Sequence, residues 1–307
     1  MCDMIKPSFI PPPAIRHLRD LVRYRMKLTN MLTGEKNRAQ NCLTVSNLKL
    51  DDVFSDVFGK SARSITEYIL AHSGEHFDVA QFVDKRCKAL MSEIQAAVDG
   101  AVSPEQAVKL RQCLDHIDQL QLHHQQLEQE ILRICEPFAD VLRLLRAVPG
   151  LSSDPMTAIS VLSEIGGDMS VFPTAKNLCS WAGCCPRNDQ SGGKVKSTRI
   201  FKAGAFLKPL LVQVANSLIH SKKHPEITER YRCIKSRRGH GKAIIAVGKM
   251  LLTAIWNILS KLVPYSSEGF ISTHRIMPAS KSLTVSQALS LLRHRGYTLV
   301  DDTVPAC

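Results

Sequence analysis

A serine followed by two glycines and a series of cations is the stretch of this chain best suited to contact a phosphate. Ser191 stands directly before Gly192 and Gly193. Glycine lets a backbone approach a ligand closely because it has no side chain. The cations that follow suit a nucleic-acid backbone, and they are Lys194, Lys196, Arg199 and Lys202. A flexible, solvated basic loop would have the same composition, so this window alone leaves both interpretations open.

The positive charge of the chain is concentrated around this stretch. The 307 residues carry a formal net charge of +12 at pH 7. Residues 187–242 contain fourteen Lys and Arg, Arg237 and Arg238 among them, and three acids, which leaves eleven of those twelve charges there. A surplus confined to one region indicates a binding surface for a polyanion. We therefore predict a nucleic-acid partner, and we expect these cations to contact it.

A membrane surface would attract the same charge, but the sequence offers little else in its favour. No secretory signal follows Met1. Residues 243–262 are nearly all apolar, about the length of a membrane span, but Lys249 and Asn257 interrupt them. We interpret this stretch as a buried core helix and expect no membrane partner.

Candidate metal ligands are poorly spaced in this sequence. The ten cysteines include no CxxC pair, which disfavours zinc, and thiols without a secretory signal suggest a reducing compartment. Asp51, Asp52 and Asp56 fit either a metal site or the acids expected in a first helical turn. Three histidines at 116, 123 and 124 lack a good i, i+4 ligand set. We assign no metal ligand.

Helical spacing dominates the rest of the chain, so we predict a mainly α fold. Apolar residues recur every three or four positions in the ranges 14–40, 61–71, 79–98, 206–218, 224–238 and 285–295. A further short helix is expected over 51–60. The strongest start signal is Ser103-Pro104-Glu105-Gln106, and no breaker follows before Pro137. About thirty residues of such spacing predict a coiled-coil arm.

The helix over 14–40 has a second, basic face. Arg16, Arg19, Arg23, Arg25 and Lys27 recur along it. This face is either solvated or lies along a nucleic-acid backbone, and the sequence does not decide between the two.

A tight helical hairpin is predicted shortly before the serine. Pro149-Gly150 ends one helix, and Ser152-Ser153-Asp154-Pro155 caps the next. Such a hairpin can direct backbone N–H groups at a phosphate, which makes Gly150 a candidate contact in a helix-hairpin-helix-like element. A plain αα-hairpin fits equally well. A further helix ends at Trp181-Ala182-Gly183, closed by the glycine.

Several of these motifs, in this order and spacing, resemble insertion-sequence transposases of the 110 family. The likeness covers roughly residues 6–262. The motifs are Ser8 to Pro13, Leu18-Arg19-Asp20-Leu21, Asn37-Arg38, Phe58 to Arg63, Val148-Pro149-Gly150-Leu151, Phe172-Pro173-Thr174-Ala175, Trp181-Ala182-Gly183, Pro186, Ser191-Gly192-Gly193-Lys194 and Ile200 to Gly204.

The resemblance implies a domain organisation and a chemistry. It implies a remnant of a ribonuclease-H-like α/β domain over 1–58, a helical coiled-coil arm over 59–147, an all-helical transposase domain with a serine loop over 148–262, and a carboxy-terminal tail over 263–307. Ser191 matches the serine that attacks DNA in this family, although a loop serine capping a turn is the competing interpretation. The family also implies Mg²⁺ at an acidic site, a guide RNA, homo-oligomers through the arm, and a bacterial, cytoplasmic, nucleoid-associated location.

The acidic metal-binding motifs of the family would precede Pro11 and have no match here. We therefore expect a truncated copy, or a start at an internal methionine, that is inactive alone. The first functional hypothesis is a DNA transposase or recombinase. The alternatives are a non-catalytic nucleic-acid-binding helical protein and a pseudogene fragment.

Overall fold

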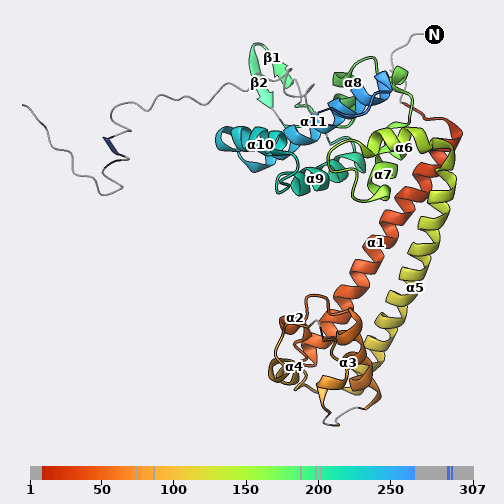
Figure 1. Ribbon diagram of the computed structural model, residues 1–307, viewed down its shortest axis with the longest axis vertical. Helices are drawn as coiled ribbons and strands as arrows, with labels where there is room; N and C mark the ends of the chain where they lie inside the picture. The colour runs from red at the N-terminus through yellow and green to blue at the C-terminus, as the bar shows by residue number, and fades with distance from the viewer. Residues whose placement is uncertain are drawn as a thin grey trace, which may run out of the picture. The chain divides into compact units, whose positions relative to one another are not determined.

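The computed structural model describes residues 9–72, 75, 77–85, 87–186, 189–197, 199–200, 202–266, 289–290 and 292. Within them the fold is mainly helical, as predicted (Figure 1). The helices are α1 (Pro13–Val45), α2 (Leu50–Val53), α3 (Lys60–Ala71), η1 (Val79–Gln81), α4 (Met91–Ala97), α5 (Pro104–Ile134), η2 (Glu136–Phe138), α6 (Ala139–Arg146), α7 (Pro155–Ile165), η3 (Met169–Val171), α8 (Ala175–Trp181), α9 (Leu207–Leu218), α10 (Pro225–Arg238) and α11 (His240–Lys261). The described strands are β1 (Asp189–Ser191) and β2 (Lys194–Ser197).

The structure confirms the two helix starts that were predicted from their capping residues. Ser103 accepts a hydrogen bond from the Gln106 N–H at the start of α5, and Asp154 accepts one from Met156 at the start of α7. The predicted helix over 285–295 lies almost wholly outside the described residues, as does most of the predicted tail.

Two of the shorter helix predictions are wrong in extent. Residues 79–98 form the single turn η1 and the separate helix α4, and α2 ends at Val53 because Phe54 is extended. Short polar side chains compete for the backbone here. Asp56 accepts from the Phe58 N–H, Asp78 from Ala80, and Ser61 from Asp84.

The long helices α1 and α5 pack side by side in opposite directions (Figure 1). Arg25 Nε donates to Glu128 Oε1 at 2.7 Å, and one turn further along α1 the Thr29 hydroxyl lies 3.1 Å from His124 Nε2. The apolar stripe of the predicted arm is therefore covered by α1 of the same chain. Whether the arm also joins two chains stays a prediction.

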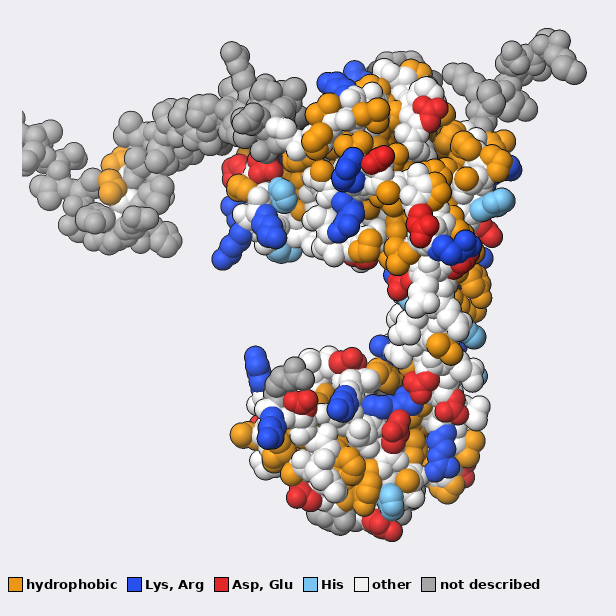
Figure 2. Space-filling model, turned by 45° about the vertical axis from the view of Figure 1, so that its right-hand side comes forward, with side chains coloured by type: hydrophobic (Ala, Val, Ile, Leu, Met, Phe, Trp, Pro, Cys, Tyr) orange, Lys and Arg blue, Asp and Glu red, His pale blue; other side chains and the backbone are white. Residues whose placement is uncertain are grey.

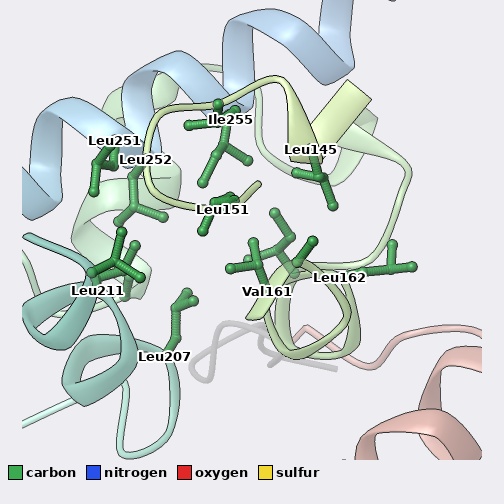
Figure 3. Packing of buried hydrophobic residues seen from close by; sticks show 14 of the residues in the cluster. Leu145, Leu151, Val161, Leu162, Leu207, Leu211, Leu251, Leu252 and Ile255 are labelled. Atoms are coloured by element: carbon green, nitrogen blue, oxygen red, sulfur yellow. The ribbon is translucent and has the colours of Figure 1, made fainter. Parts of the chain in front are cut away.

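Two hydrophobic cores lie at opposite ends of this helix pair. The first combines the start of α1 and the end of α5 with α6 to α11. The second combines the end of α1 and the start of α5 with α2 to α4. Figure 3 shows part of the first core, where Leu151 lies between leucines of α9 and α11 on one side and Val161 and Leu162 of α7 on the other.

Helix α11 is long and apolar enough to cross a membrane by length and composition alone. In this fold half of its apolar window is buried. Its buried face packs on α8, α9 and α10, in keeping with the predicted core helix.

The basic face of α1 has an internal role that the sequence did not suggest. Arg23 makes a two-pronged ion pair with Glu164 of α7, at 2.8 and 2.9 Å, and Glu164 is buried. Arg19 donates to the backbone carbonyls of Ser163 and Glu164, each at 2.8 Å. The hydrogen bond to Glu164 raises the pKa of Arg23, whereas burial lowers the pKa of Arg19. These two arginines therefore attach α1 to the end of α7, while Arg16 and Lys27 remain exposed.

This ion pair gives a stability prediction. We expect Glu164→Ala to lower the free energy of unfolding by about 2 kcal/mol, because it leaves two half-buried guanidinium groups without their carboxylate. Urea denaturation followed by circular dichroism measures the change. The control is Glu130→Ala, which removes an exposed partner of Arg133 and should leave the midpoint unchanged. Equal midpoints for wild type and Glu164→Ala would contradict the assignment.

Candidate functional site

The predicted basic loop folds as a β-hairpin, which we call the serine hairpin (residues 189–197). Strands β1 and β2 are antiparallel, and Ser191 pairs directly with Lys194 across a two-residue loop. Gly192 and Gly193 form that loop with φ of 57° and 74°. Positive φ at both positions is the requirement of a type I′ turn, whose twist matches that of the strands. The two glycines are thus explained by the turn itself.

The hairpin geometry brings the hydroxyl and one cation to one face. Directly paired residues of an antiparallel ladder point to the same side, so Ser191 and Lys194 share a face. Lys196 lies at a register irregularity between the Gln190–Val195 and Asp189–Ser197 pairs, so regular strand alternation does not apply to it. All three are exposed. Apart from the immediate chain neighbours, no heavy atom of the described residues lies within 4 Å of where a Cβ on either loop glycine would stand, so the turn itself is open.

The other two cations predicted beside the serine follow the hairpin. Arg199 and Lys202 are exposed, and the Arg199 N–H donates to the Ser197 hydroxyl at 3.2 Å. They belong to the segment that returns the chain to the core rather than to the paired strands.

The base of the serine hairpin begins at the end of α8, where the predicted glycine closure is confirmed. Gly183 has φ of 69°, its N–H donates to Ser180, and the N–H of Cys184 donates to Cys179. This is the Schellman arrangement. Beyond it, an isolated antiparallel bridge joins Pro186 to Ile200.

Below that bridge two backbone segments touch through their glycines. A Cβ on Gly183 would stand 2.8 Å from the carbonyl oxygen of Ala203, and a Cβ on Gly204 would overlap the carbonyl oxygen of Ala182. Gly204 also has a positive φ, of 68°. We call this the glycine contact. It brings together the ends of two motifs that lie about twenty residues apart in the sequence.

Both ends of the segment that carries the hairpin are attached to the first core. Trp181 packs against the rings of Phe9 and Phe172, with centroids 5.9 and 5.5 Å away. Phe206, just after Gly204, lies 4.1 Å beneath the guanidinium of Arg23. Phe9, shortly before α1, and Arg23 of α1 therefore contact the residues that flank the hairpin segment on its two sides.

Gly150 occupies a packing position in the turn between α6 and α7. It has φ of 81°, and a Cβ there would stand 2.6 Å from Val214 Cγ1 of α9. The neighbouring N–H groups of Val148 and Leu151 already donate within the turn. Close packing on α9 is thus sufficient reason for the glycine, and its contact with a phosphate stays a prediction.

Arg237 and Arg238 end helix α10 and are exposed. Arg237 donates to the carbonyl oxygen of Cys233 at 3.2 Å. In the face drawn in Figure 2, basic side chains are interspersed with acidic and apolar ones rather than forming one continuous patch.

We also considered whether a cysteine or a metal site could act near the hairpin. Burial raises the pKa of Cys184 to about 11, so this thiol is protonated and unreactive at neutral pH. Among the described residues no group of three or more His, Cys, Asp and Glu is placed to hold a metal ion. His124 lies in the α1–α5 seam and His116 beside Glu35 at 3.9 Å.

Sequence reasoning found the serine and its cations but missed what positions them. The strand pairing is local and Gly192-Gly193 was its signal, whereas the glycine contact and the support from Arg23 join residues that are more distant in the chain. Glycines at the ends of two motifs were the available signal, because a glycine next to an element boundary often marks a close backbone approach.

Comparison with known proteins finds a family match for the central part of the chain. Residues 142–232 match the model of the family described as "Transposase IS116/IS110/IS902 family". A "Probable family 20 transposase" of Pseudomonas aeruginosa is 25% identical over 180 residues, which cover 58% of this chain and 52% of that protein. The "Transposase for insertion sequence element IS1111A" of Coxiella burnetii is 28% identical over 141 residues, covering 45% and 38%. The matched part thus spans about half or less of each relative's length.

The turn geometry predicts which loop sequences preserve the hairpin. Replacing Gly192-Gly193 by Asn-Gly should keep it, because asparagine tolerates positive φ, whereas Ala-Ala should open it at a cost of about 1–2 kcal/mol per residue. Cross-strand nuclear Overhauser effects between residues 190 and 195 report the pairing. An intact ladder in the Ala-Ala variant would contradict the type I′ assignment.

Proposed function

We propose that this chain takes part in DNA transposition as an IS110-family transposase, with Ser191 as the attacking group. The match of residues 142–232 to the family described as "Transposase IS116/IS110/IS902 family" supports this proposal. The observation that carries the proposal is the exposed hydroxyl at the tip of a hairpin, on the same face as Lys194, with Lys196 also exposed on β2. The curated relatives carry the name transposase, which supports the same direction.

The reaction would be a phosphoryl transfer. The Ser191 Oγ–phosphorus bond forms while one phosphorus–oxygen bond to deoxyribose breaks. The serine proton passes to a general base, and the departing oxygen takes up a proton. The ammonium groups of Lys194 and Lys196 would stabilise the negative charge that develops on the phosphate oxygens. A serine hydroxyl needs activation by a base or a metal for this role.

The magnesium that the family resemblance implies does not fit the described residues. They contain no acidic cluster able to hold it, so we derive no step through a metal in this chain. A longer member of the family that carries the acidic motifs would have to supply it. A guide RNA and assembly of several chains belong to the same proposal.

The first test is formation of a covalent adduct. The full chain is mixed with element-end DNA, guide RNA and Mg²⁺, together with a longer family member whose own serine is changed to alanine. We expect this mixture to form a denaturant-resistant adduct between the full chain and DNA. Ser191→Ala should abolish it, with at least a 100-fold lower yield. Gel electrophoresis in detergent with labelled DNA measures the yield.

The control is Ser236→Ala, which removes another exposed hydroxyl on α10 and should leave the yield unchanged. An adduct that survives Ser191→Ala rejects Ser191 as the nucleophile. Binding without any adduct from wild type favours the non-catalytic nucleic-acid-binding function instead.

The second test concerns the binding surface. Replacing Lys194, Lys196, Arg199 and Lys202 by Gln should weaken DNA binding and flatten the dependence of log affinity on log salt. Each lost phosphate contact reduces the slope by about 0.9. Fluorescence anisotropy across a salt series measures it.

The matched control is Arg38→Gln with Arg133→Gln, two exposed arginines that already pair with Glu35 and Glu130. These should leave the slope as it is in wild type. If the hairpin variant keeps the wild-type slope while Arg237→Gln with Arg238→Gln flattens it, the interface lies on α10.

A further inference from the structure

We propose that Gly183 and Gly204 are positioning residues for Ser191, which hold the base of the serine hairpin by direct backbone contact. This inference rests on the proposed function, because it gives the two glycines a role in placing its nucleophile. Neither residue touches DNA in the proposal. Each acts by having no side chain.

The first support is steric. For each glycine, the nearest atoms to an added Cβ belong to the other segment's backbone, Ala203 for Gly183 and Ala182 for Gly204. A backbone atom cannot swing away as the end of a flexible side chain can, so any side chain at these positions would push the segments apart. Both glycines also have positive φ, so a substitution adds backbone strain.

The second support is the position of the contact. Residues 184–203 lie between the two glycines, and this segment includes the whole serine hairpin. The contact closes the segment at its base, and the Pro186–Ile200 bridge closes it again nearer the tip. A two-stranded hairpin is marginally stable alone, so the orientation of its tip depends on this base.

The third support is that the contact joins two elements already fixed in the core. Gly183 completes the end of α8, and the carbonyl oxygen of Gly204 accepts a hydrogen bond from Lys208 in the first turn of α9. Trp181, two residues before Gly183, packs on Phe9, and Phe206, two residues after Gly204, lies beneath Arg23. Pushing the two segments apart would therefore tilt the hairpin relative to a core that stays folded.

The test compares Gly183→Ala and Gly204→Ala with Gly166→Ala. Gly166 has φ of 77°, and the nearest atom to its added Cβ is Phe9 Cζ at 3.8 Å, an ordinary contact. The control thus also introduces a side chain at a positive φ, with a ψ of 177° that glycine alone favours, without forcing two segments apart. All three variants are made in the full chain, and their thermal midpoints are recorded.

Millisecond hydrogen exchange is the first readout. We expect amides of residues 189–197 to exchange at least tenfold faster in Gly183→Ala and Gly204→Ala than in wild type, with no change in α5. Gly166→Ala should leave the hairpin amides within twofold of wild type. Unchanged hairpin exchange in both contact variants overturns the proposal.

The second readout separates positioning from stability. We expect single-turnover adduct formation to slow at least tenfold in the two contact variants, with DNA affinity within threefold of wild type. Gly166→Ala should slow it less than threefold at a comparable thermal midpoint. Equal slowing in all three variants means that stability alone is responsible and overturns the positioning role. Absence of adduct from wild type defeats the proposed function, and hydrogen exchange then decides alone whether the glycines hold the hairpin.

Discussion

A single continuous helix connects the two hydrophobic cores of this protein. The 33 residues of α1 span about 50 Å at a rise of 1.5 Å per residue. Leu18 near one end is completely buried in the first core, and Leu43 near the other end is buried in the second. Because α5 packs antiparallel along the same length, the spacing of the two cores follows from hydrogen-bonded helix geometry rather than from a loop. The rest of the fold assembles around the ends of this pair.

Positive charge in this protein has two physically different uses. Arg19 and Arg23 of α1 are committed to Glu164 and to backbone carbonyls, and Arg25 pairs with Glu128. The lysines of the serine hairpin are exposed, by contrast. Net charge along the sequence does not separate these uses, because the acidic partner of an arginine can lie more than a hundred residues away. Burial and ion pairing do separate them.

The sequence predicted those features that local chemistry decides. A serine cap with proline at the first position marked the start of α5, and glycine marked the end of α8. The mainly helical class and the two long helices followed from apolar spacing, but their pairing within one chain did not. The helix predicted over 79–98 was wrong in extent, because the chain leaves helical geometry between η1 and α4, where the Asp84 N–H donates to the Ser61 hydroxyl.

The candidate site was only partly accessible from sequence. Ser191 and its cations were identified from residue type and order, but the two glycines beside it were explained as a ligand approach, whereas the turn requires their positive φ. The pairing of β1 with β2 is local, and Gly192-Gly193 was its turn signal. The meeting of Gly183 with Gly204 depends on a contact between segments about twenty residues apart. No spacing rule for a single segment contains that information.

The closure of the α1–α5 seam within one chain limits how two copies could join along this arm. One route uses the outward surfaces of the pair, where Met31 on α1 and Leu122 on α5 are 57% and 53% exposed. The other route opens the seam and trades one of the two helices for its counterpart in a neighbouring subunit, which is domain swapping. The first route would leave the subunits separable without unfolding. The second would make dissociation as slow as the melting of a long helix pair.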